Sequence, residues 1–276
     1  MQWTRRTLLG GIAAASVPLA GCSLPSDSDP DGASDGGDGG SGSFDQVRVD
    51  GRTLVVELGS GTAERVNVIA PDGSAYASTS VAQGATRVEF DIGLSYPPGE
   101  YRVVASAGDS TVAETALTIA PDLAITEVGV GANHPERMPE NLNYSDEQAV
   151  VEITNRGSGP GIVEQVILLG EVPNPTRELA QEGNDTSGIY DMEDGFGDLE
   201  QLVIPARDSK VVFTTSKPFL FTADGIECKS RTQRGEFNLE AITRVDDSSL
   251  SEQYSIRYSA SEEPDQCDIT ILGGDD

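Results

Sequence analysis

Residues 97–105 read Pro-Pro-Gly-Glu-Tyr-Arg-Val-Val-Ala, and they follow the stretch Thr-Arg-Val-Glu-Phe-Asp-Ile at residues 86–92. The earlier stretch alternates polar and apolar residues, which is the pattern of a β-strand with one buried face. The later stretch opens with turn residues, because proline fixes φ and glycine accepts a positive φ, and it continues as a β-rich run. Together they predict two consecutive strands of an all-β fold.

Runs of the same kind surround these two stretches from residue 44 to residue 120. Three further runs are rich in β-branched side chains: residues 52–58, 64–70 and 111–119. Turn signals at residues 71–73 and 108–109 separate them. About seven strands in so short a span are typical of a β-sandwich.

A second series of runs begins after Pro121 and Asp122. Strands are expected at residues 122–130, 148–154, 161–169, 211–215, 236–244, 253–258 and 268–272. A polar insertion at residues 170–200 interrupts the series. No long stretch shows a helical period, so we expect a second, larger β-sandwich at 121–273 and little helix.

The stretch at 97–105 resembles the penultimate turn and strand of bacterial and archaeal immunoglobulin-like surface domains, and the likeness of pattern extends over 44–120. Residues 121–123 and 148–159 resemble the start of a CARDB-type adhesion domain, which is also an immunoglobulin-like sandwich. The resemblance implies two immunoglobulin-like β-sandwich domains, at 44–120 and 121–273. It supports a fold more than a function, because one fold hosts many functions.

The N-terminus has the order of features of an export signal. Arg5 and Arg6 precede an apolar run at residues 8–19 that is too short to span a bilayer. The arginine pair resembles a twin-arginine signal, and Leu-Ala-Gly-Cys at residues 19–22 resembles a prokaryotic lipobox. This resemblance implies that Cys22 is lipidated and becomes the new N-terminus. The alternative is an ordinary cysteine in a simple secretory signal.

Residues 23–43 consist almost entirely of serine, aspartate, glycine and proline. Such a segment buries too little apolar area to offset the entropy of ordering, so we expect a disordered tether. With a signal at residues 1–22, the chain is expected on the extracytoplasmic face of the cell membrane, held there by a lipid anchor.

The composition is strongly acidic, with 18 Lys and Arg against 46 Asp and Glu and a formal charge of −28. This charge argues against a nucleic-acid partner, because such binding needs cations that neutralise phosphates. The only lysines are Lys210, Lys217 and Lys229. An acid-rich, lysine-poor composition resembles that of proteins from salt-loving archaea, where salt screens self-repulsion. The alternative is an acidic secreted protein from an ordinary organism.

Cysteine usage agrees with export. If the lipid occupies Cys22, then Cys228 and Cys267 remain as a pair, and disulfides persist in oxidising compartments. We therefore predict a bridge between them. A metal site would need two more ligands nearby, and none is apparent.

Candidate sites for chemistry are few. His134 is the only histidine and is expected in an exposed loop, and no cofactor motif occurs. A weak calcium candidate is the acidic group Asp191, Glu193, Asp194 and Asp198, although such a group also occurs by chance in so acidic a chain. Asn143 and Asn184 begin acceptor sequons for glycosylation.

These observations favour a non-enzymatic surface protein that acts in binding, adhesion or assembly, with surface proteins or glycans as partners. One alternative is a carboxylate-based carbohydrate-active enzyme or accessory module, since two carboxylates suffice for glycoside hydrolysis. The single tryptophan, Trp3, lies in the signal, so the mature chain lacks the commonest sugar-stacking residue. A transporter-associated solute-binding lipoprotein is the other alternative, although such receptors usually have two α/β lobes.

Overall fold

The computed structural model describes residues 44–59, 63–139, 145–181, 183–193, 197–221, 227–245, 249–262 and 267–273. These residues all belong to one compact unit, Gly40–Asp276. The predicted signal and tether, with Arg5, Arg6 and Cys22, lie outside the described residues. No helix among the described residues is long and apolar enough to cross a membrane.

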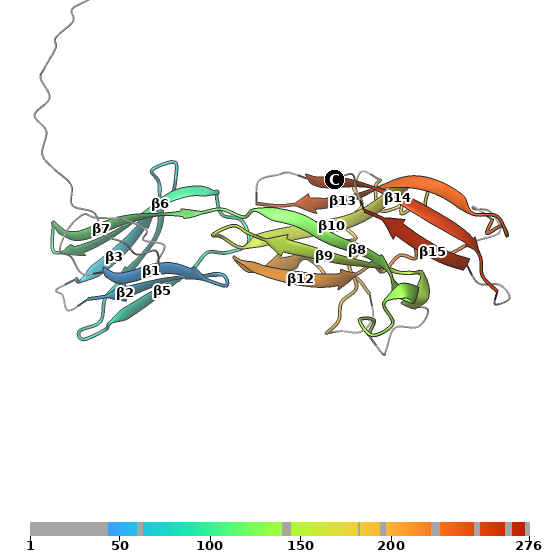
Figure 1. Cartoon of the computed structure of the whole chain (residues 1–276). Coiled ribbons are helices and arrows are strands. Elements are labelled where there is room, and N and C mark those ends of the chain that lie inside the picture. The colour runs from blue at the N-terminus through green and yellow to red at the C-terminus, as the bar shows by residue number, and fades with distance from the viewer. Residues whose placement is uncertain are drawn as a thin grey trace, which may run out of the picture. The chain divides into compact units, whose positions relative to one another are not determined.

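The first sandwich consists of seven antiparallel strands in two sheets (Figure 1). One sheet has the order β1-β2-β5, with β1 at Phe44–Asp50, β2 at Thr53–Leu58 and β5 at Arg87–Asp91. The other has the order β4-β3-β6-β7, with β4 at Ala75–Ser80, β3 at Arg65–Ile69, β6 at Gly99–Ala107 and β7 at Ser110–Ile119. Apolar side chains from both sheets form one core, which includes Val56, Val68 and Val103.

The stretch that begins at Pro97 forms the turn and strand β6, as the sequence predicts. Tyr101 is fully buried, and its hydroxyl donates to the Pro97 carbonyl at 2.8 Å. Its ring meets that of Tyr76 edge-on, with centroids 5.2 Å apart. Gly99 has a φ of +146°, and a Cβ there would lie 2.8 Å from Pro71 Cγ. The positive φ and the close approach of Pro71 explain why this turn needs glycine. The buried hydrogen bond and the ring contact explain why this strand needs tyrosine.

The second sandwich also has two antiparallel sheets. The smaller has the order β12-β9-β8, with β12 at Asp208–Phe213, β9 at Ala149–Asn155 and β8 at Leu123–Val130. The larger has the order β11-β10-β13-β14-β15: Leu202–Ile204, Gly161–Gly170, Gln233–Thr243, Ser249–Ala260 and Cys267–Leu272. Helix among the described residues is limited to two 3₁₀ turns, Gly131–Asn133 and Ser145–Glu147. The all-β sandwich class predicted from the sequence is confirmed.

The segment predicted as a polar insertion, residues 170–200, also supplies part of the second core. Val172 and Ile189 are buried in the same cluster as Leu168 and Leu239. Ile189 also forms an isolated antiparallel bridge with Thr214, next to the end of β12. The insertion interrupts the strand series, since no strand is described between β10 and β11, and two of its apolar residues also fill the sandwich.

A buried asparagine holds the turn that follows β9. The amide of Asn155 donates to the carbonyls of Gly159 at 2.8 Å and Ile204 at 3.1 Å. Its side-chain oxygen accepts from the N–H groups of Asp122 at 3.1 Å and Gly157 at 2.9 Å. One fully buried side chain therefore satisfies four backbone groups where β8 begins, β9 ends and β11 ends.

The predicted disulfide is confirmed. Cys228 and Cys267 are bonded, with Cα atoms 6.2 Å apart. The bridge joins the segment before β13 to the first residue of β15.

Candidate functional site

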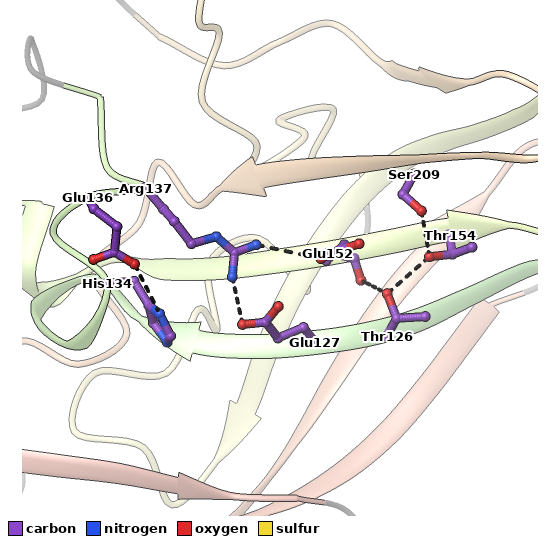
Figure 2. Close-up of polar contacts among 8 residues, drawn as sticks. All are labelled: Thr126, Glu127, His134, Glu136, Arg137, Glu152, Thr154 and Ser209. Carbon is purple, nitrogen blue, oxygen red and sulfur yellow. Dashed lines mark hydrogen bonds and ion pairs between the residues drawn. The ribbon is translucent and has the colours of Figure 1, made fainter.

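The outer face of the sheet β12-β9-β8, with the loop after β8, carries a group of paired polar side chains. We call it the polar sheet face and define it by Thr126, Glu127, His134, Glu136, Arg137, Glu152, Thr154 and Ser209 (Figure 2). Along β9 the residues alternate, so that Val151 and Ile153 enter the core while Glu152 and Thr154 face outward.

Three hydroxyl groups cross the sheet in a row at one end of this face. Thr126 Oγ1 lies 3.1 Å from Thr154 Oγ1, which lies 2.8 Å from Ser209 Oγ. Thr126 also donates to the Glu152 carbonyl at 3.3 Å. A register shift in β8 between Ile125 and Glu127 places Glu127 opposite Glu152, so that Thr126 and Glu127 both lie on the outer face.

Two carboxylates and one guanidinium occupy the middle of the face. Glu127 and Glu152 are cross-strand partners in the β8–β9 ladder. Arg137 Nη1 lies 2.6 Å from Glu127 Oε1, and its Nη2 lies 3.6 Å from Glu152 Oε2. Figure 2 shows the guanidinium reaching between the two acids. Because like charges directly opposite destabilise a sheet, Arg137 offsets a repulsion that the register creates.

The only histidine lies beside this cluster. Its ring packs so closely over β8 that a Cβ at Gly129 would lie 2.7 Å from His134 Cδ2. His134 Nδ1 is 3.9 Å from Glu136 Oε1, and the side chain is 30% exposed. The loop position is as predicted, but the side chain is partly covered rather than fully exposed, because Gly129 leaves room for the ring.

A small apolar cluster closes the other end of the face. It consists of Met138, Val150, Tyr190 and Phe213, all buried. Val150 and Phe213 are cross-strand partners in β9 and β12, while Met138 and Tyr190 come from loops that cover them. Tyr190 lies in the segment that was predicted to be polar.

The arrangement suits recognition better than hydrolysis. Glycoside hydrolysis needs two carboxylates that flank the scissile bond with room for substrate between them. Here Arg137 lies between Glu127 and Glu152 and pairs with both. The hydroxyl row and the charged cluster share an outer sheet surface, where they can contact a partner.

The calcium candidate is only partly described. The Asp191 carboxylate accepts from the Glu193 N–H at 2.8 Å, and Asp198 accepts from the Thr215 hydroxyl at 2.5 Å. Asp194 lies outside the described residues. Within the described ranges, no three His, Cys, Asp or Glu side chains come close enough to hold a metal ion.

Only one of the two predicted glycosylation sequons lies among the described residues. Asn143 lies outside the described residues. Asn184 is half-buried, donates to the Glu178 carbonyl at 2.6 Å and accepts from the Thr186 N–H at 2.9 Å. Glycosylation at both positions stays a prediction, as does lipidation of Cys22.

A hollow of about 560 Å³ lies at one end of the first sandwich. It is lined by Leu58, Gly59, Ala63, Glu64, Val81, Ala82, Gln83, Gly84, Ala85 and Thr86. Glu64 is the only charged residue in this lining, and its carboxylate already accepts from the Gly108 N–H at 3.0 Å. The hollow offers no group that is poised for chemistry.

The sequence did not reveal the Glu127–Arg137–Glu152 cluster. Both strands were predicted, but the pairing of Glu127 with Glu152 depends on the register shift at Thr126, which no local pattern announces. The signal that was available is a lone arginine in the loop after β8, with glutamates on the two neighbouring strands.

No family model matches this sequence, and no curated protein matches it. Among solved structures, it is similar to the BSP domain of a biofilm-associated protein, with 14% identity over 79% of this chain and 30% of that one, and a TM-score of 0.24. A two-domain fibronectin type III segment from chicken tenascin shows 11% identity over 84% and 99% of the two chains, with a TM-score of 0.24. A β-glucuronidase from glycoside hydrolase family 2 shows 12% identity over 75% and 18%, with a TM-score of 0.21.

Proposed function

We propose that this chain is a non-enzymatic, lipid-anchored surface protein whose β-sandwiches act in binding, adhesion or assembly. The observation that carries the proposal is the polar sheet face. Its hydroxyls hydrogen-bond one another on an outer sheet surface, and Arg137 lies between the two acids that face each other and pairs with both. The face is therefore suited to contact a protein or glycan surface.

The N-terminal sequence supports the anchored part of the proposal. An arginine pair, a short apolar run and Leu-Ala-Gly-Cys end at Cys22, and a polar, glycine-rich segment follows. Two acyl chains on one cysteine suffice for stable anchoring, whereas a single chain binds only marginally.

Mass spectrometry of the membrane-extracted protein tests the anchor. We expect a mature chain that begins at Cys22 and carries lipid, and release of the Cys22→Ser variant to the medium. Ser23→Ala, which changes the neighbouring residue and keeps the thiol, is the matched control and is expected to stay anchored. An unlipidated native chain would contradict the anchor.

Hydrolysis of aryl glycosides tests the non-enzymatic part. We expect no turnover above that of buffer with the native chain or with Glu152→Gln. Turnover by the native chain that Glu152→Gln abolishes would overturn this part of the proposal and support the carboxylate-based alternative.

A further inference from the structure

Strand β4 is an edge strand with an unusual lack of charge. It pairs only with β3 in the part of the chain that the structure describes. No residue from 73 to 86 is charged, although the whole chain is 23% charged. Of the strands at sheet edges in the described ranges, only β4 and the three-residue β11 lack a charged side chain.

The hydrogen bonds show which backbone groups of β4 face its open edge. The Val81 N–H donates to the Glu64 carbonyl at 2.8 Å, so alternate residues before it also point their N–H and C=O groups toward β3. The groups of Ser78 and Ser80 therefore point the other way, to the open edge. The close side-chain contact between Ser78 and Asn67, 2.7 Å, agrees with a non-hydrogen-bonded pair at that position.

Natural sheets usually protect such an edge with charges, proline, bulges or a covering segment, because an unpaired edge is a template for another strand. Strand β4 has one register shift, between Ala75 and Ala77, and pairs regularly with β3 from Ala77 to Ser80. The side chains that β4 exposes are small: Ala75, Ser78 and Ser80. These residues neither repel nor cover an approaching strand.

We propose that β4 is a self-association strand, at which the β4 strands of two copies of this chain pair antiparallel. The chain has a formal charge of −28, so two copies repel each other over most of their surface and can approach best where the surface is neutral. Serine and threonine are compatible when they face each other across strands. A two-fold pairing is also the commonest form of self-assembly.

Charge also argues for a second copy over a different protein. A partner attracted to so acidic a chain is expected to be cationic, and complementary charge would guide it to acidic surfaces. Strand β4 offers no acidic side chain to such a partner. A second copy of the chain instead presents an identical, neutral β4 strand. The inference does not depend on the lipid anchor.

Sedimentation equilibrium tests the proposal with the full chain carrying Cys22→Ser. We expect a monomer–dimer equilibrium that shifts toward dimer when NaCl rises from roughly 0.1 M to 1 M, because the Debye length falls from about 10 Å to 3 Å. Ser78→Pro, which removes one edge N–H from each copy, is expected to weaken the dimer at least about ten-fold.

Val211→Pro is the matched control, since Val211 is an exposed residue of the edge strand β12 that lies outside the polar sheet face. It is expected to leave the dimer unchanged. If Ser78→Pro lowers the melting temperature, Ser80→Asp replaces it, and its weakening is expected to lessen at high salt. A chain that stays monomeric at all concentrations and salts would overturn the proposal, and so would a dimer that neither β4 variant weakens.

Discussion

Strands β4 and β12 are both sheet edges, one in each sandwich. Charged side chains protect β12, whereas β4 has none. In β12 the open-edge N–H of Ser209 donates to the Asp208 carboxylate at 2.8 Å, and Lys210 adds a charge to the same strand. In β4 the edge groups of Ser78 and Ser80 have small neighbours and no charge nearby on the strand. The side chains of the two edges therefore differ, and so does their pairing: β4 has a register shift against β3, whereas the end of β12 is covered by a hydrogen bond from the Tyr190 N–H to the Phe213 carbonyl. On our proposal, the chain directs self-contact to β4 because that strand, unlike β12, carries no charged side chain.

The largest expected effect comes from removing the side chain of Asn155, which holds the turn after β9, the strand that β12 pairs with. Asp208 is the cross-strand partner of Asn155, whose amide satisfies four backbone groups. Asn155→Ala is expected to lower the free energy of unfolding by about 3 kcal/mol or more, because it leaves buried groups unsatisfied. Chemical denaturation measures it, with the outward-facing Thr154→Ala as control. Equal effects of the two variants would contradict this role.

The corresponding test in the first sandwich is Tyr101→Phe, on strand β6 of the sheet that holds β4. Loss of the hydrogen bond to the Pro97 carbonyl is expected to cost about 1 kcal/mol. Burial raises the pKa of Tyr101 above its ordinary value of 10.0, and Tyr76 and Asp72 add to the rise. The folded state therefore favours the protonated phenol. Its contribution to the free energy of unfolding is complete below about pH 10 and is lost as the pH rises further.

Thermal unfolding at increasing pH measures this effect. The native chain is expected to lose stability above about pH 10 more steeply than Tyr101→Phe does, because only the native chain must ionise a buried phenol at that position. Tyr76 is partly buried beside it and burial also raises its pKa, so some slope remains in the variant. Identical slopes would show that Tyr101 does not titrate with unfolding.

A smaller effect is expected from the charges on the outer face of the β12 sheet. Arg137→Ala leaves Glu127 and Glu152 opposite each other and is expected to cost roughly 0.5–1 kcal/mol at low salt, and less at high salt. The matched control is Arg102→Ala in the first sandwich, which removes a more exposed pair with Glu114 and is expected to cost almost nothing. Similar losses in both variants would contradict a specific role for Arg137.

The smallest change in stability is expected when β12 is made to resemble β4. Asp208→Ser frees the Ser209 N–H, and it is expected to alter the free energy of unfolding by no more than about 0.5 kcal/mol. In a Ser78→Pro background it is nevertheless expected to restore weak self-association through β12. Sedimentation equilibrium checks this outcome, and a strictly monomeric double variant would show that Asp208 does not protect the edge.

Much of the fold was predictable because strongly patterned strands carry their own signal. The alternation at residues 86–92 predicted β5, and the β-rich runs predicted β6, β8, β9 and the last three strands to within a few residues. Strand β4 had no such signal, because Ala-Tyr-Ala-Ser-Thr-Ser has weak β-propensity and no clear alternation. Its place in the sheet comes from pairing with β3.

The interior and the candidate site were less predictable, because both depend on contacts between distant segments. Val172 and Ile189 lie in irregular loops, and only the completed sandwich buries them. Glu127 and Glu152 meet because β8 shifts register, and His134 is partly covered because Gly129 lacks a side chain. A local pattern predicts which residues are strands but not which residues face each other.

Amide hydrogen exchange on the full chain carrying Cys22→Ser tests the difference between the two edges most directly. Exchange at Ser78 and Ser80 is to be compared with exchange at Ser209 and Val211 while protein concentration rises at high salt. We predict that Ser78 and Ser80 become protected with concentration, whereas exchange at the two β12 positions stays constant. Constant exchange at Ser78 and Ser80, or equal protection of both strands, would contradict the account.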